Sequence, residues 1–147
     1  MLVDANILLY SVDEDSPFHA PARDWMAASL NGSQRVGIPW MSFWAFLRIV
    51  TNPRALERPL TPRQAWEYVA DWLDAPATWV PGPDRGHRQI FHDLLEQHDV
   101  RAGLVTDAVM AAIAIEHGLI VISADSDFAR FPQVKWLNPV APRNPPS

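Results

Sequence analysis

The chain has 147 residues, a formal net charge of −5 and an apolar fraction of 48%, a composition that indicates one globular domain and excludes a disordered chain. It has no cysteine, which excludes disulfides, thiolate zinc sites and cysteine nucleophiles. Asp4 interrupts the first apolar stretch, so no secretory leader is expected, and the longest strongly apolar run, from Ala108 to Ile115, is too short to span a bilayer. These features predict a soluble, cytoplasmic protein without a membrane partner.

The apolar patterns predict short strands that alternate with helices. In chain order they predict a strand at 1–3, either a helical turn or a strand extension at 7–10, a helix at 19–30, a strand at 36–39, a helix at 41–51, a helix that begins at 61–62, a strand at 78–80, helices at 84–97 and 104–117, and strands at 119–123 and 134–137. The alternation is typical of an α/β domain with a mainly parallel central sheet flanked by helices. We expect this domain to cover residues 1–138, with a loose C-terminal tail at 139–147.

The helix that begins near residue 61 has a clear start signal. Thr61 supplies a capping hydroxyl, and Pro62 suits the first helical position. The helical period then predicts a buried stripe that contains Trp66, Val69, Ala70 and Leu73.

Two acidic residues, Asp107 and Asp125, are expected to lie at one edge of the sheet. A helix from Asp107 to His117 is about 15–17 Å long at 1.5 Å per residue. After the reversal at Gly118, the strand from Leu119 to Ala124 returns about 16–20 Å at 3.3 Å per residue. Because the two lengths match, both carboxylates should lie at the edge where the carboxyl ends of the strands meet.

Asp4 follows the first predicted strand and should lie at the same edge, where open parallel sheets bind ligands. Clustered carboxylates raise one another's pKa values, so a bound cation is needed to keep them ionised. Oxygen ligands favour Mg²⁺ or Mn²⁺ over Zn²⁺. Taken singly, Asp107 could favour a helix N-terminus, and Asp125 and Asp127 could be turn residues. Taken together, the acids predict a metal site.

Three stretches carry a resemblance to a known family: VDANILLYSVDEDSPFH at 3–19, IPWMSFWAFLRIVTNPR at 38–54, and LVTDAVMAAIAIEHGLIVISADSDFARFPQVKWLNP at 104–139. In this order they resemble the PIN-domain ribonucleases, and among these the VapC-type toxins of toxin–antitoxin pairs. The resemblance implies a single PIN-like domain and Mg²⁺- or Mn²⁺-dependent hydrolysis of RNA by a metal-activated water. It also implies products with a 3′-hydroxyl and a 5′-phosphate, a VapB-type antitoxin partner, and a homodimer.

The resemblance also suggests roles for individual residues. Asp4, Asp107 and Asp125 match catalytic, metal-binding acids of the family, and Asp127 is close enough in sequence to be a further ligand. Asn6 falls where the family has a polar residue beside the first acid, and an amide there can orient that carboxylate.

One position departs from the family pattern. Ala45 stands where these proteins usually have a glutamate. Three consequences are open: the site binds one metal ion and not two, it binds the metal more weakly, or Asp127 or a water molecule replaces the missing ligand. Arg48 and Arg54 are candidate RNA contacts, although solvated surface arginines are the simpler interpretation. Three tryptophans could stack on bases or instead pack in a core or an interface: Trp40, Trp44 and Trp66.

Two other functions remain open. The missing glutamate favours a catalytically weak PIN domain that binds RNA or a partner without cutting, whereas the intact set of Asp4, Asn6, Asp107 and Asp125 argues against it. A small-molecule phosphohydrolase is the third alternative, and cleavage of a phosphoester without cleavage of RNA would favour it.

Overall fold

Five parallel strands form the centre of the computed structural model, which describes residues 1–142. Their order across the sheet is β3-β2-β1-β4-β5. The strands are two residues each: β1 (Leu2–Val3), β2 (Val36–Gly37), β3 (Thr78–Trp79), β4 (Val121–Ile122) and β5 (Trp136–Leu137). The expected α/β fold with a parallel sheet is confirmed, with every strand shorter than its apolar pattern suggests.

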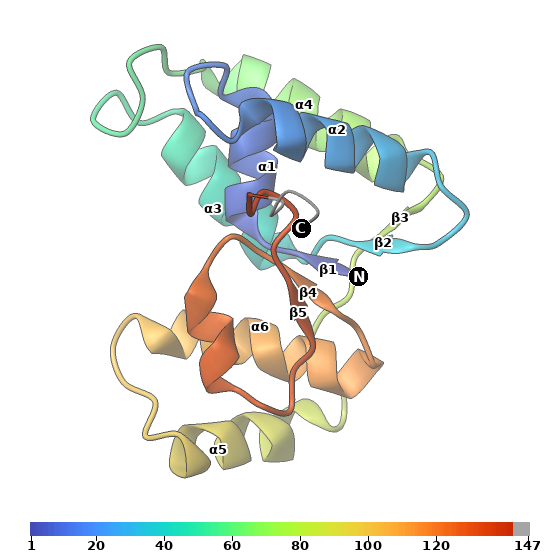
Figure 1. The fold of residues 1–147 in the computed structure, drawn as a ribbon, viewed down its shortest axis with the longest axis vertical. Helices are drawn as coiled ribbons and strands as arrows, with labels where there is room; N and C mark the ends of the chain where they lie inside the picture. The colour runs from blue at the N-terminus through green and yellow to red at the C-terminus, as the bar shows by residue number, and fades with distance from the viewer. Residues whose placement is uncertain (143–147) are drawn as a thin grey trace, which may run out of the picture.

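Helices cover both faces of the sheet (Figure 1). One face carries α1 (Ala5–Val12), α2 (His19–Leu30), α3 (Trp40–Val50) and α4 (Pro62–Asp74). The other carries α5 (His87–Gln97) and α6 (Leu104–His117), and the short 3-10 helix η1 (Ser126–Arg130) packs against α6. The ambiguous segment at 7–10 is helical and belongs to α1. The 3-10 turn was not anticipated, and α5 begins three residues later than predicted.

Two hydrophobic clusters fill the space between the sheet and its helices. The cluster under α1–α4 contains Phe43, Phe46 and Trp72, and the cluster under α5 and α6 contains Met110 and Ile113. Val140 is 5% exposed and packs in the first cluster. Residues 143–147 lie outside the described part of the chain, so the loose tail at 139–147 stays a prediction.

The start of α4 is as predicted, and its buried face is predicted in part: Val69 is buried, and Ala70 and Leu73 are half-buried. The Thr61 hydroxyl accepts from the Gln64 backbone N–H, and the Gln64 side chain accepts from the Thr61 N–H, which is a complete capping box. The prediction that Trp66 lies in the core was wrong, because that indole is 48% exposed. The residues buried on α4 are Ala65, Val69 and Trp72. Trp66 is rotated by about 100° from Ala65 around the helix and therefore leaves the core.

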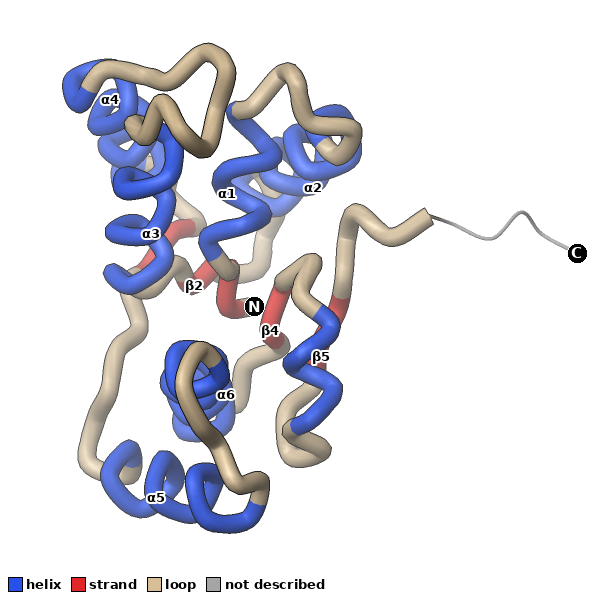
Figure 2. The backbone as a smooth tube through the Cα atoms, turned by 90° about the vertical axis from the view of Figure 1, so that its left-hand side faces the viewer, coloured by secondary structure: helices blue, strands red, loops and turns tan. Residues whose placement is uncertain are grey.

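The register of the sheet positions the acidic edge. Leu2 pairs with Val121 and Val3 pairs with Ile122. The next residues of both strands, Asp4 and Ser123, therefore emerge side by side where β1 and β4 end. Figure 2 looks toward this carboxyl edge, with α6 seen end-on below α1 and α3.

Candidate metal centre

Asp4 caps the first helix at the end of β1. Its backbone N–H donates to the Ile122 carbonyl at 2.9 Å, which continues the pairing of β1 with β4. Its Oδ1 accepts from the Ala5 N–H at 2.8 Å, so the same carboxylate terminates the strand and begins α1. The side chain is thereby held in one orientation at the carboxyl edge.

A buried hydroxyl, Ser123, connects Asp4 to the other side of the site. Ser123 is fully buried, and its Oγ donates to Asp4 Oδ2 at 2.7 Å. The same oxygen accepts from the Asn6 side-chain amide at 3.0 Å and from the Asp125 backbone N–H at 3.0 Å. Ser123 is not among the site residues predicted from the sequence. The available signal was its place as the last residue of the predicted strand, two residues before Asp125.

The Asn6 amide bridges the two strand ends, as the resemblance suggests for a residue that orients the first acid. Its Nδ2 lies 3.3 Å from Asp4 Oδ2, and its Oδ1 accepts from the Ala124 N–H at 3.1 Å. Because both ends of the amide are engaged, Asn6 fixes the loop after β4 relative to Asp4.

Three carboxylates converge beside this network. Asp107 in the first turn of α6, Asp125 after β4 and Asp127 in η1 each offer an oxygen, and these atoms lie within 4.8 Å of one another. Asp125 Oδ1 accepts from the Asp127 N–H at 2.9 Å, which shapes the turn that holds both acids. Asp4 lies outside this group of three.

The electrostatics indicate that the site favours a cation. Burial raises the pKa of Asp107 to about 6, with further contributions from the charges of Asp125, Asp4 and Asp127. Burial also raises the pKa of Asp4, against the opposing effect of its hydrogen bonds from Ser123 and Ala5. Carboxylate oxygens grouped in this way fit Mg²⁺ or Mn²⁺.

Only one cationic side chain contacts these three acids within residues 1–142. Arg130 Nε lies 3.3 Å from Asp127 Oδ1, and the two side chains are 66% and 47% exposed. This surface pair contributes little because solvent screens it. The repulsion among the carboxylates is therefore mostly uncompensated in the protein itself.

The α3 segment borders the site without supplying a carboxylate. Ser42 is buried in the first turn of α3, and its hydroxyl donates to the Val3 carbonyl at 2.7 Å, next to Asp4. Ala45 is half-buried one turn further along. Arg48 and Arg54 are exposed, and neither forms an ion pair within the described chain.

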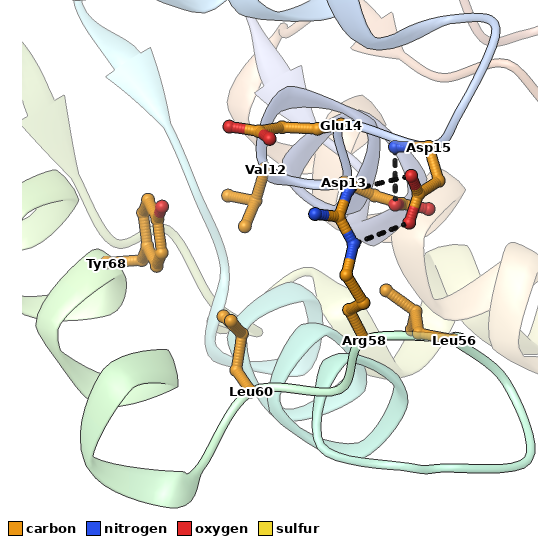
Figure 3. Close-up of a pocket in the computed structure, with 8 residues that line it drawn as sticks. All are labelled: Val12, Asp13, Glu14, Asp15, Leu56, Arg58, Leu60 and Tyr68. Atoms are coloured by element: carbon orange, nitrogen blue, oxygen red, sulfur yellow. Dashed lines mark hydrogen bonds and ion pairs between the residues drawn. The ribbon is translucent and has the colours of Figure 1, made fainter.

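A pocket of about 220 Å³ lies at the opposite end of α1 from Asp4 (Figure 3). Its polar rim is an ion pair in which Arg58 contacts Asp15 at 2.8 Å, which ties the loop before α2 to the loop before α4. The two ends of α1 are about 12 Å apart by helical rise. This pocket is therefore separate from the acidic edge.

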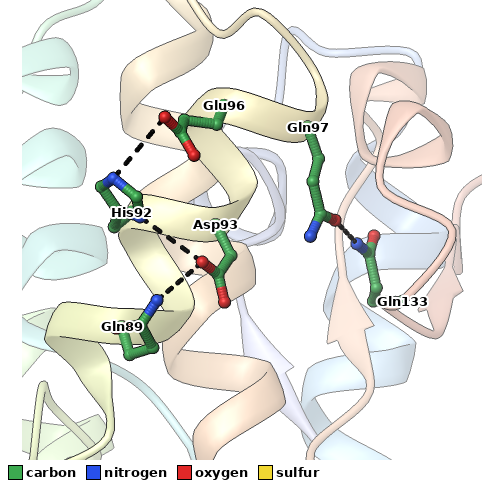
Figure 4. A network of polar contacts seen from close by, with 6 residues as sticks. All are labelled: Gln89, His92, Asp93, Glu96, Gln97 and Gln133. Atoms are coloured by element: carbon green, nitrogen blue, oxygen red, sulfur yellow. Dashed lines mark hydrogen bonds and ion pairs between the residues drawn. The ribbon is translucent and has the colours of Figure 1, made fainter.

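Within residues 1–142 the carboxylate cluster contains no histidine. His92 on the exposed face of α5 lies 3.4 Å from Asp93 and 3.8 Å from Glu96 (Figure 4). Gln97 and Gln133 form a separate hydrogen bond at 2.9 Å beside it. These contacts are typical of a solvated helix surface.

The chain is similar to known proteins over most of its length. The model of the PIN domain family matches residues 1–134. Ribonuclease VapC37 of Mycobacterium tuberculosis is 41% identical over 140 residues, which cover 95% of this chain and 97% of the relative. Ribonuclease VapC33 of the same species is 36% identical over 140 residues, with 95% and 98% covered.

Solved structures share the fold at low sequence identity. VapBC2 from Rickettsia felis bound to a promoter DNA fragment aligns with a TM-score of 0.69 at 14% identity, covering 93% of this chain and 96% of that one. FitAB bound to the IR36 DNA fragment aligns with a TM-score of 0.65 at 16% identity, covering 97% of both chains. In residues 1–142 no helix has the length and apolar character needed to cross a membrane. The chain belongs to the PIN-domain family, in the group of the VapC ribonucleases.

Proposed function

We propose that the protein is a Mg²⁺- or Mn²⁺-dependent endoribonuclease that acts as the toxin of a VapBC-type toxin–antitoxin pair. The observation that carries this proposal is the convergence of Asp107, Asp125 and Asp127 within 4.8 Å beside the hydrogen-bonded Asp4. The relatives that share most of this chain's length are named ribonucleases, which supports RNA as the substrate. This substrate implies action in the cytoplasm.

Each acid has a distinct part in the proposed chemistry. Asp107, Asp125 and Asp127 would hold the ion, and Asp4 would complete the ligand set. The bound ion would polarise the scissile phosphodiester and lower the pKa of a water molecule that attacks phosphorus. Ser123 and Asn6 occupy Asp4 Oδ2, so Oδ1, which accepts only the Ala5 N–H, keeps a lone pair for an ion or a water.

The protein must also bring RNA to this edge despite its net negative charge. Arg48 and Arg54 are exposed near the helix that borders the site, and guanidinium groups bind phosphates well. We propose that both contact the RNA backbone. By analogy with the family, the cut leaves a 3′-hydroxyl and a 5′-phosphate.

The proposed partners follow from the same comparisons. The Rickettsia structure is a VapBC complex, and another aligned structure is a toxin–antitoxin complex from Klebsiella pneumoniae. We propose that a VapB-type antitoxin silences this protein and that the toxin is a homodimer. Ala45 favours one alternative, a catalytically weak PIN domain that binds RNA or a partner, because a carboxylate is missing at that position.

Cleavage of total cellular RNA by the purified protein, free of antitoxin, tests the proposal. With Mn²⁺ or Mg²⁺ we expect discrete fragments that disappear with EDTA and in Asp4→Asn. Asp71→Asn, at an exposed aspartate on α4 outside the cluster, is the matched control and should cut like the parent. A folded parent that cuts no RNA with either metal would favour the binding-only alternative. Cleavage of only a small phosphoester would favour a phosphohydrolase.

A further inference from the structure

A side chain of the edge strand β5 holds the end of β4. The Trp136 indole Nε1 donates to the Ser123 carbonyl at 2.8 Å. Trp136 is half-buried and packs on the hydrophobic cluster under α5 and α6. Figure 2 shows β4 and β5 side by side, with the loop after β4 leading into η1. The hydrogen bond therefore lies where the sheet ends and the loop that carries Asp125 begins.

The sequence explains why a side chain donates this hydrogen bond. The Ser123 N–H donates to the Leu137 carbonyl at 3.1 Å, in the regular parallel ladder. In the same ladder the Ser123 carbonyl would accept from the N–H two residues beyond Leu137. That residue is Pro139, which has no N–H. Because Ser123 is fully buried and a buried carbonyl without a donor is costly, the Trp136 indole takes the place of the missing backbone donor.

The peptide between Ser123 and Ala124 is held at both ends. Its carbonyl accepts from the Trp136 indole, and its N–H, which belongs to Ala124, donates to Asn6 Oδ1 at 3.1 Å. Trp136 lies on β5, on one side of β4, and Asn6 lies on α1, which follows β1 on the other side. We call these two hydrogen bonds the peptide clamp. Any rotation of this peptide plane would break both of them.

The peptide clamp directly precedes two acids of the metal centre. The Asp125 N–H donates to Ser123 Oγ at 3.0 Å, and the Asp127 N–H donates to Asp125 Oδ1 at 2.9 Å. Because a peptide unit is planar, a rotation of the clamped peptide would also reorient the backbone that follows it. The clamp therefore fixes the direction in which the loop carries the Asp125 carboxylate away from the strand.

We propose that Trp136 is a positioning residue of the metal centre, whose indole N–H holds the clamped peptide so that Asp125 faces the ion. The inference rests on the proposed metal-dependent function and adds a residue that acts through the backbone. Removal of a side chain that orients a metal ligand commonly weakens metal binding by about 10- to 100-fold. Because Trp136 acts through one further peptide, we expect an effect at the lower end of this range.

Mn²⁺ binding in the absence of RNA tests the proposal. The full chain, freed of metal, is titrated with Mn²⁺, and the free ion is followed by electron paramagnetic resonance. Trp136→Phe keeps an aromatic ring and loses the N–H donor, and it should raise the Kd for Mn²⁺ about tenfold. Trp79→Phe is the matched control, because it makes the same change at a half-buried indole of β3, at the opposite edge of the sheet. The control should change the Kd less than about twofold.

A restored backbone donor distinguishes positioning from packing. Pro139→Ala provides residue 139 with an N–H that can bond the Ser123 carbonyl in the regular ladder. The double variant Trp136→Phe/Pro139→Ala should therefore return the Kd for Mn²⁺ to within about threefold of the parent value. A backbone N–H at residue 139 does not repair lost packing of the indole. A double variant that recovers nothing would overturn the role of this hydrogen bond.

Amide hydrogen exchange tests the peptide clamp without any metal. In EDTA, exchange followed by NMR reports on the Ala124 N–H, and amides inside α6 correct for any change in global stability. Relative to those amides, the Ala124 N–H should exchange about 2- to 12-fold faster in Trp136→Phe, the range expected for one lost hydrogen bond. If Trp136→Phe does not fold, site-specific replacement of Trp136 by 3-benzothienylalanine makes the same comparison, because sulfur then replaces the indole N–H.

Two further results would overturn the proposal: a Kd for Mn²⁺ in Trp136→Phe equal to that of the parent, or an equal rise in Trp79→Phe. If the parent cuts RNA and Trp136→Phe binds Mn²⁺ normally, the nuclease proposal stands and the role of Trp136 fails. If the parent binds no Mn²⁺, the metal-dependent function and the role of Trp136 toward the ion both fail. The exchange of the Ala124 N–H then decides whether the clamp holds the peptide.

Discussion

Replacing Asp107 with asparagine should stabilise the metal-free protein. Burial and the charges of the neighbouring carboxylates raise the pKa of Asp107 to about 6, against about 3.9 for an unperturbed aspartate. The difference of about 2 corresponds to about 3 kcal/mol of unfavourable free energy once the folded side chain is ionised. Because the carboxylate is only half-buried, solvent screening reduces this to about 1–2 kcal/mol.

The pH dependence identifies the cause of this gain. An aspartate whose pKa is higher in the folded than in the unfolded chain costs stability when it ionises, so the parent should lose stability from about pH 4 to pH 6. The amide in Asp107→Asn carries no charge at any pH and avoids that loss. The variant should therefore be more stable by about 1–2 kcal/mol at pH 7, with most of the gain absent at pH 4.

Urea unfolding in EDTA at both pH values measures the effect. At pH 7 the gain corresponds to an increase in Tm of about 2–8 °C. The exposed-site control Asp71→Asn should stay within about 0.5 kcal/mol of the parent. Added Mn²⁺ should stabilise the parent more than the Asp107→Asn variant. An Asp107→Asn variant that is less stable than the parent at pH 7, or equally stabilised at both pH values, would refute carboxylate repulsion as the cause.

Three further changes probe the site and the core. Ser123→Ala removes the acceptor for the Asn6 amide and the Asp125 N–H. It should lower the free energy of unfolding in urea by about 1–3 kcal/mol and lower kcat, whereas Ser123→Thr should recover both. Unchanged stability and kcat in Ser123→Ala would show that this hydroxyl does not support the site. Ala45→Glu should lower the Kd for Mn²⁺ in calorimetric titration, because it adds a charged ligand, and unchanged heats would remove position 45 from the site. Trp72→Ala should cost about 3–5 kcal/mol and Trp66→Ala clearly less, about 1–2 kcal/mol, because half of the Trp66 indole is exposed; similar losses would contradict the assignment of the buried face of α4.

The part of the site that the sequence predicts is the part fixed by regular geometry. The rise of α6 and the length of the return to β4 bring Asp107 and Asp125 together, and both distances follow from standard helix and strand dimensions. The alternation of strands and helices likewise predicts the parallel sheet. These features need no knowledge of side-chain contacts.

What the sequence does not predict depends on contacts between distant segments. Ser123 became part of the site only through the β1–β4 register, which aligns its hydroxyl with Asp4 across 119 positions of sequence. The exposed Trp66 illustrates the same limit on α4. The buried residues of α4 are spaced four and three positions apart, at Ala65, Val69 and Trp72. A choice made by hydrophobicity alone selects the large indole of Trp66 over the small side chain of Ala65.

The end groups of the RNA fragments test the central claim most directly. If the acidic edge activates a water molecule, each downstream fragment carries a 5′-phosphate and each upstream fragment a 3′-hydroxyl. Ligation of an adaptor that requires a 5′-phosphate, without prior kinase treatment, should therefore capture the fragments made with Mn²⁺. Fragments with a 5′-hydroxyl and a 2′,3′-cyclic phosphate, formed equally in EDTA, would mean that the RNA's own 2′-hydroxyl attacks and that the carboxylate cluster is not the catalytic centre.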